Sequence, residues 1–148
     1  MENPNILSSD VATLIERISP VSQAAGTVTT GWIDASKFDA FLAEIQTGVL
    51  GVAATVDAKL QQATDSGGTG AKDVTNKAIT QLVKATNDNN EVAINCRAEE
   101  LDINNGFKFF RLSITVGAAA SLIAAEVFGL SARHQPATAK ATFVQAVA

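Results

Sequence analysis

Residues 107–130 constrain the fold more than any other part of the chain. Their sequence is FKFFRLSITVGAAASLIAAEVFGL. In the first half an apolar side chain recurs at every second position: Phe110, Leu112, Ile114 and Val116. This period of two predicts a β-strand with one inward row. After a small-residue turn, the rest predicts a second strand with an inward row: Ile123, Ala125 and Val127. The second strand is also apolar on much of the other face, with Leu122, Ala124 and Phe128, which is typical of a central, covered strand.

A helix over residues 118–130 is the alternative, because Ala and Leu are strong helix formers. We favour the strand because Val127 and Phe128 suit strands, and Gly117 and Gly129 suit strand ends better than a helix interior. Glu126 interrupts the apolar run, which is shorter than the roughly 20 residues that a membrane span needs. We therefore expect no membrane partner.

Length and charge set the broad class of the protein. The 148 residues predict a single domain over 1–148, and 47% hydrophobic residues exclude wholesale disorder. A net charge of −4 without any Lys/Arg cluster argues against direct binding of nucleic acid. Cys96 is the only cysteine, so the chain has no disulfide framework and no cysteine zinc site. The start, MENPNILSSD, lacks the features of a signal peptide and predicts synthesis and assembly in the cytoplasm.

The first 25 residues predict an N-terminal arm. Residues 1–5 are expected to be loose, and Ser9 or Asp10 to cap a short helix that ends at Pro20. That helix would carry apolar side chains on one face: Val11, Leu14, Ile15 and Ile18. We expect the arm either to dock on its own sheet or to reach onto a neighbouring subunit.

Further short strands follow in the remainder of the chain. We predict them at 26–33, 38–47, 54–64, 78–83 and 91–97, and a C-terminal tail at 138–148. Turns or loops separate them at 34–37, 65–70, 84–90, 98–102 and 104–106. The glycine-rich loop 65–70, DSGGTG, is expected to be flexible and to order on contact with a partner. Seven or eight short strands with frequent turns predict an all-β antiparallel β-sandwich, jelly-roll-like, with a barrel as the alternative.

No motif in the sequence identifies a reaction. The run Gly67 to Lys72 resembles a phosphate loop, but Ala71 precedes the lysine and Asp73 follows it, whereas a Walker loop needs Gly-Lys-Ser/Thr. His134 is the only histidine and is interpreted as a surface residue, so a histidine-based metal site is excluded by count. The alternating pattern of 91–97 makes Cys96 a small core residue rather than a nucleophile.

Two other groups of residues have a functional and a structural interpretation. Glu99, Glu100 and Asp102 could hold a hard cation or serve a hydrolase, but without EF-hand spacing we favour an ion pair with Arg97 or a solvated connection. Trp32, with Phe38, is the only aromatic candidate for a sugar-binding groove, and a core role for Trp32 is favoured. We therefore predict no catalytic, cofactor-binding or metal residues and no cofactor.

Three stretches resemble a known family: VDAKLQQATD with its continuation GTGAKD, INCRAEELD, and TVGAAAS. Together they resemble small virion structural proteins of tailed bacteriophages and prophages, over residues 26–137. The resemblance implies a β-sandwich located in the virion and assembled in the host cytoplasm. It implies no catalytic residues. Its implied partners are the major capsid protein or neighbouring head-tail proteins, with a homo-oligomer expected.

The function expected from this resemblance is a capsid decoration (cement) protein that binds the major capsid protein. A head-tail neck or collar component is the alternative within the same family. A receptor- or carbohydrate-binding sandwich at the tail is the alternative from a different class.

Overall fold

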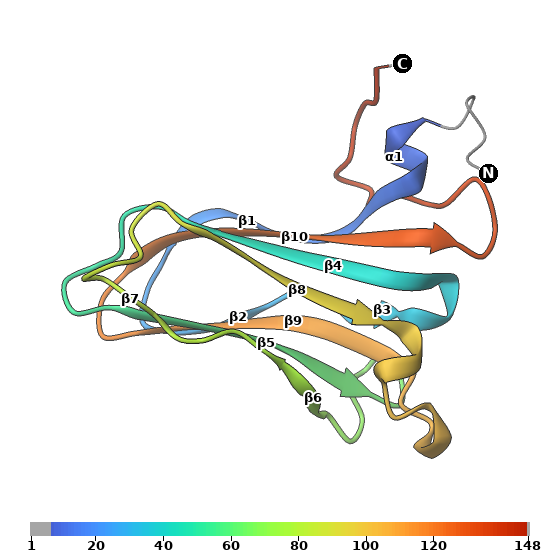
Figure 1. Ribbon diagram of the computed structural model, residues 1–148, viewed down its shortest axis with the longest axis horizontal. Coiled ribbons are helices and arrows are strands. Elements are labelled where there is room, and N and C mark those ends of the chain that lie inside the picture. The colour runs from blue at the N-terminus through green and yellow to red at the C-terminus, as the bar shows by residue number, and fades with distance from the viewer. Residues whose placement is uncertain (1–6, 148) are drawn as a thin grey trace.

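The computed structural model describes residues 7–147 and shows two antiparallel β-sheets packed face to face (Figure 1). The first sheet, sheet A, has the strand order β1 (Ala12–Gln23), β10 (Ser121–Ala132), β4 (Phe38–Thr47) and β8 (Glu91–Arg97). The second, sheet B, has the order β2 (Gly26–Thr29), β9 (Phe109–Gly117), β5 (Thr55–Ala63) and β6 (Lys72–Ala78). Two short strands join sheet B: β3 (Ile33–Asp34) pairs with β9, and β7 (Leu82–Val83) pairs with β5. The helical elements are α1 (Ser8–Val11), η1 (Ala35–Lys37), η2 (Ala98–Glu100) and η3 (Ile103–Asn105).

The eight main strands are paired in a nested order. The first pairs with the last, β1 with β10, and the pairs β2–β9, β4–β8 and β5–β6 follow inward along the chain. Alternate pairs lie in opposite sheets, which is the arrangement of a jelly roll. The predicted fold class, an all-β antiparallel sandwich of jelly-roll type, is confirmed.

The strands form because their apolar rows meet between the sheets. The predicted rows of β9 and β10 are buried, and so are Phe41, Ala43 and Ile45 of β4. The rings of Phe41 and Phe110 lie 4.5 Å apart between centroids and join sheet A to sheet B. Within residues 118–130, the first three form the connection after β9 and the rest belong to β10, so none of them is helix. β9 and β10 do not pair with each other, since their connection crosses from one sheet to the other.

The predicted short N-terminal helix is present as α1, but its predicted extension to Pro20 is wrong. α1 is a single turn, and the chain then enters β1, a strand that pairs with β10. Register irregularities lie between Leu14 and Glu16 and between Ile18 and Val21. Such bulges disturb the period of two, so the spacing of the apolar residues resembles that of a helix. The second bulge also accommodates Pro20, which has no N–H to donate to a neighbouring strand. The expected loose residues 1–5 lie outside the described residues.

The strand predicted at 78–83 is also misplaced. β6 runs over Lys72–Ala78 and overlaps the predicted range at Ala78 alone, and the two-residue β7 (Leu82–Val83) lies at the end of that range. β6 is an edge strand with Val74 as its only buried residue, so its sequence KDVTNKA has no apolar alternation to detect. The strand predicted at 26–33 divides into β2 and β3.

The connections lie at the two ends of the sandwich. One end, the loop end, carries the connections β1–β2, β4–β5 and β9–β10. The other end, the terminal end, carries α1, β3, η2, η3, loop 65–70 and the irregular segment that follows β10 (Figure 1). Within the part of the chain that the structure describes, no helix is both long enough and apolar enough to cross a membrane.

Candidate functional site

A hollow of about 420 Å³ opens at the terminal end of the sandwich. It lies between β1, the connection that includes Trp32 and β3, the start of β4 and the segment after β10. Ile15, Ile33 and Phe38 contribute apolar surface, and its polar lining includes His134 and Lys37. The hollow thus brings together the predicted sugar-site aromatics Trp32 and Phe38 with the only histidine.

Trp32 is held by neighbours and is not a free platform. The guanidinium carbon of Arg111 lies 4.6 Å from the centroid of the indole ring, and Gln61 Oε1 accepts hydrogen bonds from Arg111 Nε and Nη2 at 3.0 and 2.9 Å. On loop 65–70, Gly68 lies so close that a Cβ there would be 2.6 Å from Trp32 Nε1. Because Gly68 also has φ of +86°, glycine is required at this position. Phe38 is buried, so neither aromatic presents an open ring face for a sugar to stack on.

Loop 65–70 is closed by its own hydrogen bonds, and its predicted ordering on contact with a partner stays a prediction. The backbone N–H groups of Gly67 and Thr69 donate to Asp65 Oδ1 at 2.9 and 3.1 Å. The Thr69 carbonyl accepts from the N–H and the hydroxyl of Thr64, both at 3.1 Å. Hydrogen bonds from Thr69, then from Gly67 and Gly68, lower the pKa of the Asp65 carboxyl. The loop leads into β6 and not into a helix, as expected for a segment that is no phosphate loop.

The acidic residues 99, 100 and 102 form separate ion pairs. Arg97 Nη1 lies 3.4 Å from Glu99 Oε1, as the predicted pairing with Arg97 requires. Lys77 Nζ lies 2.8 Å from Glu100 Oε1, and its hydrogen bond to that carboxylate lowers the pKa of Glu100. The Lys77–Glu100 pair connects the turn after β8 to β6, whereas the Arg97–Glu99 pair lies within that turn.

Asp102 also forms an ion pair with a lysine of β6. Lys72 Nζ lies 2.5 Å from Asp102 Oδ2, and hydrogen bonds from Lys72 and then Asn105 lower the pKa of the Asp102 carboxyl. No group of three or more His, Cys, Asp or Glu side chains with metal-binding geometry occurs between residues 7 and 147. The acidic cluster therefore has a structural explanation.

Cys96 and His134 lie in different environments. Cys96 is buried in the core, where desolvation raises the pKa of its thiol to about 11, so the thiol stays protonated at neutral pH. This confirms the predicted core role. His134 is exposed at the rim of the hollow, as predicted, and makes no side-chain hydrogen bond with any residue in the described range 7–147.

Two surface features were missed by sequence reasoning. The first is an apolar group at the loop end, the loop-end patch, formed by Val21, Val49, Val52 and Leu122. Val49 and Val52 lie in the segment GVLGVA, where apolar residues between glycines were a usable signal of exposed apolar loop positions.

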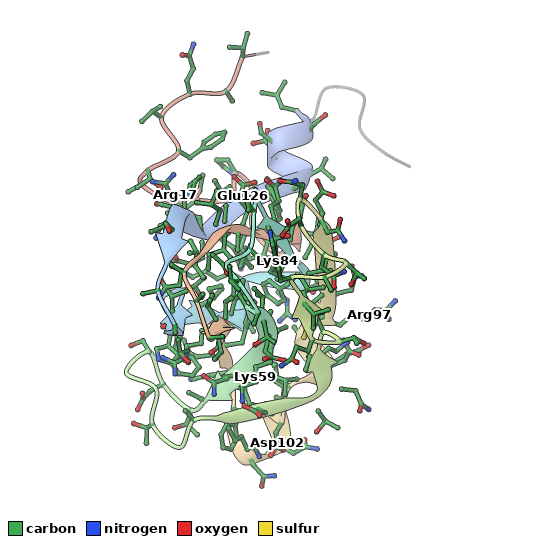
Figure 2. The ribbon with its side chains drawn as sticks, turned by 90° about the vertical axis from the view of Figure 1, so that its left-hand side faces the viewer. Arg17, Lys59, Lys84, Arg97, Asp102 and Glu126 are labelled. Carbon is green, nitrogen blue, oxygen red and sulfur yellow. The ribbon has the colours of Figure 1, made fainter. Side chains whose placement is uncertain are left out.

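The second is an acidic pair on the outer face of sheet A. Glu44 and Glu126 are directly opposite each other on β4 and β10, next to Arg17 of β1. Figure 2, which looks at the loop end, shows Arg17 and Glu126 on one side of the sandwich and Lys59 and Asp102 towards the other. Glu44 and Glu126 are recognised as neighbours only when the pairing register of β4 and β10 is known, and the sequence alone does not provide that register.

Comparison with known proteins identifies no family. No protein-family model matches the sequence, and no curated protein matches it. Among solved structures, the chain is similar to a protein chain in a structure of the naturally occurring empty particles (top component) of cowpea mosaic virus. The TM-score is 0.45 and the identity is 11%, and the match covers 91% of this chain and 98% of the viral chain. It is similar to an empty virus-like particle of the same virus, with a TM-score of 0.45 and 12% identity over 97% and 96%. It is also similar to a structure of broad bean stain virus, with a TM-score of 0.44 and 10% identity over 93% and 96%. Likeness at this level bears on neither family nor function.

Proposed function

We propose that this chain is a non-enzymatic structural protein of a virus particle. The observation that carries the proposal is a jelly roll whose interior is filled by apolar side chains. The acidic residues Glu100 and Asp102 form ion pairs with Lys77 and Lys72 of β6. Between residues 7 and 147 the Cys96 thiol is buried and no group of side chains has metal-binding geometry, which suits a protein that works through contacts. Fold alone does not assign function, so the argument depends on what the sites contain.

Jelly rolls serve mainly as viral capsid domains, lectins and cupins. A cupin site would need a set of metal ligands inside the roll, but the inward positions here are taken by residues such as Leu60, Leu112 and Val127. A lectin site would need an open aromatic face, but Arg111 and Gly68 cover Trp32. The viral structural role is the one that these side chains support.

The finer assignment that we propose is a decoration protein on the head of a tailed bacteriophage, bound to the major capsid protein. It is supported by the sequence resemblance over residues 26–137. The net charge of −4 fits a position outside a DNA-filled shell, where no basic face is needed. A ring of copies at the neck or collar is the alternative, and it differs in copy number rather than in fold.

Particles purified from a host that produces the chain test this proposal. After density-gradient separation, the chain is quantified in the particle fraction by mass spectrometry against the major shell protein. Decoration predicts a copy number comparable to that of the shell protein, and a neck position predicts one or two rings per particle. A chain found only among free proteins, with none in particles, contradicts the structural role.

A carbohydrate-binding role is the second candidate, and it would depend on the polar rim of the terminal-end hollow, which includes Lys37 and His134, rather than on a stacked aromatic ring. Glycan-array binding by the purified protein would support it if His134→Ala, at an exposed rim position, weakened binding. Changing Trp32 alone is less informative, since this ring also packs against Arg111 and loop 65–70.

A further inference from the structure

We propose that the uncharged segment after Lys140 of one copy binds the loop-end patch of a second copy. This inference deepens the proposed function, on which it rests, by naming the partner surface through which copies associate. The occupant is a second copy of this chain, and the contact is head-to-tail.

The loop-end patch is exposed and held in place. Its four residues, Val21, Val49, Val52 and Leu122, are between 42% and 85% exposed. Backbone hydrogen bonds fix Leu122 against the β4–β5 connection: Gly48 N donates to Leu122 O at 2.8 Å, and Leu122 N donates to Val49 O at 3.2 Å.

Side chains secure the rest of that connection. Leu50 N donates to Asp88 Oδ1 at 2.9 Å, and Gly51 N donates to Ser121 Oγ at 3.0 Å. The patch therefore presents apolar surface to solvent on a preformed backbone. Concentrated apolar surface of this kind marks an interaction site more often than isolated exposed residues do.

A hollow of about 450 Å³ lies beside the patch, at the ends of β1, β4 and β10. None of its lining residues is charged: Pro20, Val21, Ser22, Gln46, Thr47, Gly48, Leu122, Ile123 and Ala124. The neighbouring hollow on the same sheet is lined by Arg17, Glu44 and Glu126, and the terminal-end hollow includes Glu16, Asp34 and Lys37. Of these three hollows, only the one at the loop end accepts an uncharged apolar segment without burying a charge.

The segment after Lys140 has the matching chemistry. Its sequence ATFVQAVA contains no charged side chain. Phe143, Val144 and Val147 are 40%, 93% and 86% exposed. Apart from the bond from Phe143 N to Lys140 O, the described backbone of residues 141–147 makes no hydrogen bond with other backbone. Both its apolar side chains and its backbone groups are available for a partner.

The start of this segment is fixed at the terminal end. Lys140 N donates to Leu14 O at 2.9 Å, and Lys140 Nζ lies 2.7 Å from Glu16 Oε1 in a half-buried ion pair. Figure 1 shows the chain leaving the body near α1, whereas the connections β4–β5 and β9–β10 lie at the opposite end of the sheets.

The same copy cannot supply the aromatic side chain to its own patch. Leu14 is paired with Phe128, and Leu122 lies six residues further back along β10 (128 − 122), about 20 Å at strand spacing. Phe143 is three residues after Lys140 (143 − 140) and can move only about 10 Å from that anchor. Phe143 therefore reaches the loop-end patch only on another copy. A contact between opposite ends of two copies is heterologous and builds rings or filaments.

Sedimentation velocity on the full-length purified chain tests this contact. The wild-type chain should self-associate with increasing concentration, and Leu122→Asp and Phe143→Asp should each weaken association by about 30-fold or more, as expected for a central contact worth about 2 kcal/mol. Ile103→Asp is the matched control, because Ile103 is 49% exposed and Leu122 47%, and Ile103 belongs to neither surface. This control should associate like the wild type.

Mixing the two defective variants gives the sharper result. The Phe143→Asp chain keeps an intact patch and the Leu122→Asp chain keeps an intact segment, so an equimolar mixture should form pairs that neither variant forms alone. Failure of the mixture to pair overturns the proposal, as does a wild-type chain that stays monomeric at its highest soluble concentration. Circular dichroism of each variant establishes that it is folded.

This experiment separates the contact from the proposed function. It uses the isolated chain, so its result does not depend on any other particle protein. A chain that self-associates through these surfaces but is absent from particles would refute the virion role and leave the contact standing. If the chain is found in particles but neither Leu122→Asp nor Phe143→Asp weakens its self-association, the contact is refuted and the virion role stands.

Discussion

Truncating Phe110 tests whether β9 faces the core in the described register. Phe110 is fully buried, and its ring lies 4.5 Å from that of Phe41 in the opposite sheet. Its neighbour Phe109 is only half-buried, on the outward row of β9. The two residues are adjacent and chemically identical, so they form a matched pair whose difference depends only on the face that each occupies.

The expected loss for Phe110→Ala is about 3–5 kcal/mol, from lost burial plus the remaining cavity. Since about 1 kcal/mol shifts the melting temperature of a chain of this size by about 2–4 °C, Tm should fall by roughly 6–20 °C. Phe109→Ala should cost about 1 kcal/mol, because its side chain already meets solvent. If Phe110→Ala does not fold, the milder Phe110→Leu should still lose more than Phe109→Leu.

Urea unfolding followed by the fluorescence of Trp32, the single tryptophan, measures these losses. A double-mutant cycle with Phe41→Leu and Phe110→Leu should show a coupling of about 0.5–1.5 kcal/mol for the aromatic contact between the sheets. Equal losses at positions 109 and 110 would refute the register, and zero coupling would refute the contact.

Three further predictions test other parts of the structure. Gly129→Ala would bring a Cβ to 2.6 Å from the buried ring of Phe38, so thermal unfolding should show a loss of about 1–3 kcal/mol that Phe38→Leu partly relieves; an unchanged Tm would contradict this packing. The Cys96 thiol, with its pKa raised to about 11, should react with a disulfide reagent at pH 8 far more slowly than in urea-unfolded chain, and rapid reaction of the folded protein would disprove its burial. Lys72 lowers the pKa of Asp102, so the stability from this carboxylate is present above its unfolded pKa near ~4 and is lost as pH falls through the lower folded value. Asp102→Asn should therefore destabilise at neutral pH and progressively less in acid, which urea titrations at several pH values would show; a constant difference would exclude the linkage.

The strands that were predictable are those with a simple inward row. β4 and β8 were located to the residue, and the rows of β9 and β10 were identified, because burial on one face imposes strict alternation. Their assignment to sheets was not predictable. β9 and β10 are consecutive and separated by a short connection, yet the Ala118 backbone with φ of +65° leads the chain across to the other sheet.

Where prediction failed, the sequence pattern came from something other than strand alternation. In β1 two register irregularities produced helix-like spacing, and in β6 an edge position removed the apolar signal. For the candidate sites, the structural interpretations of Cys96 and the acidic cluster followed from spacing and chemistry. The contact of Gly68 with Trp32 and the proximity of Leu122 to Val49 join residues far apart in sequence, so they follow only from the folded arrangement.

The nested strand order also determines which parts of the chain are free to reach a neighbour. Because β1 and β10 pair with each other, removing residues 1–20 would delete most of β1 and uncover β10, and would test folding rather than an arm. A segment that leaves the body without dismantling a sheet must precede β1 or follow β10, and the nested order brings both positions to the terminal end. The loop-end patch is built from the opposite turns of the same strands, so a contact between it and Phe143, which is held close to the Lys140 anchor, relates two copies end to end. The direction of assembly that we propose is thus a consequence of the jelly-roll topology itself.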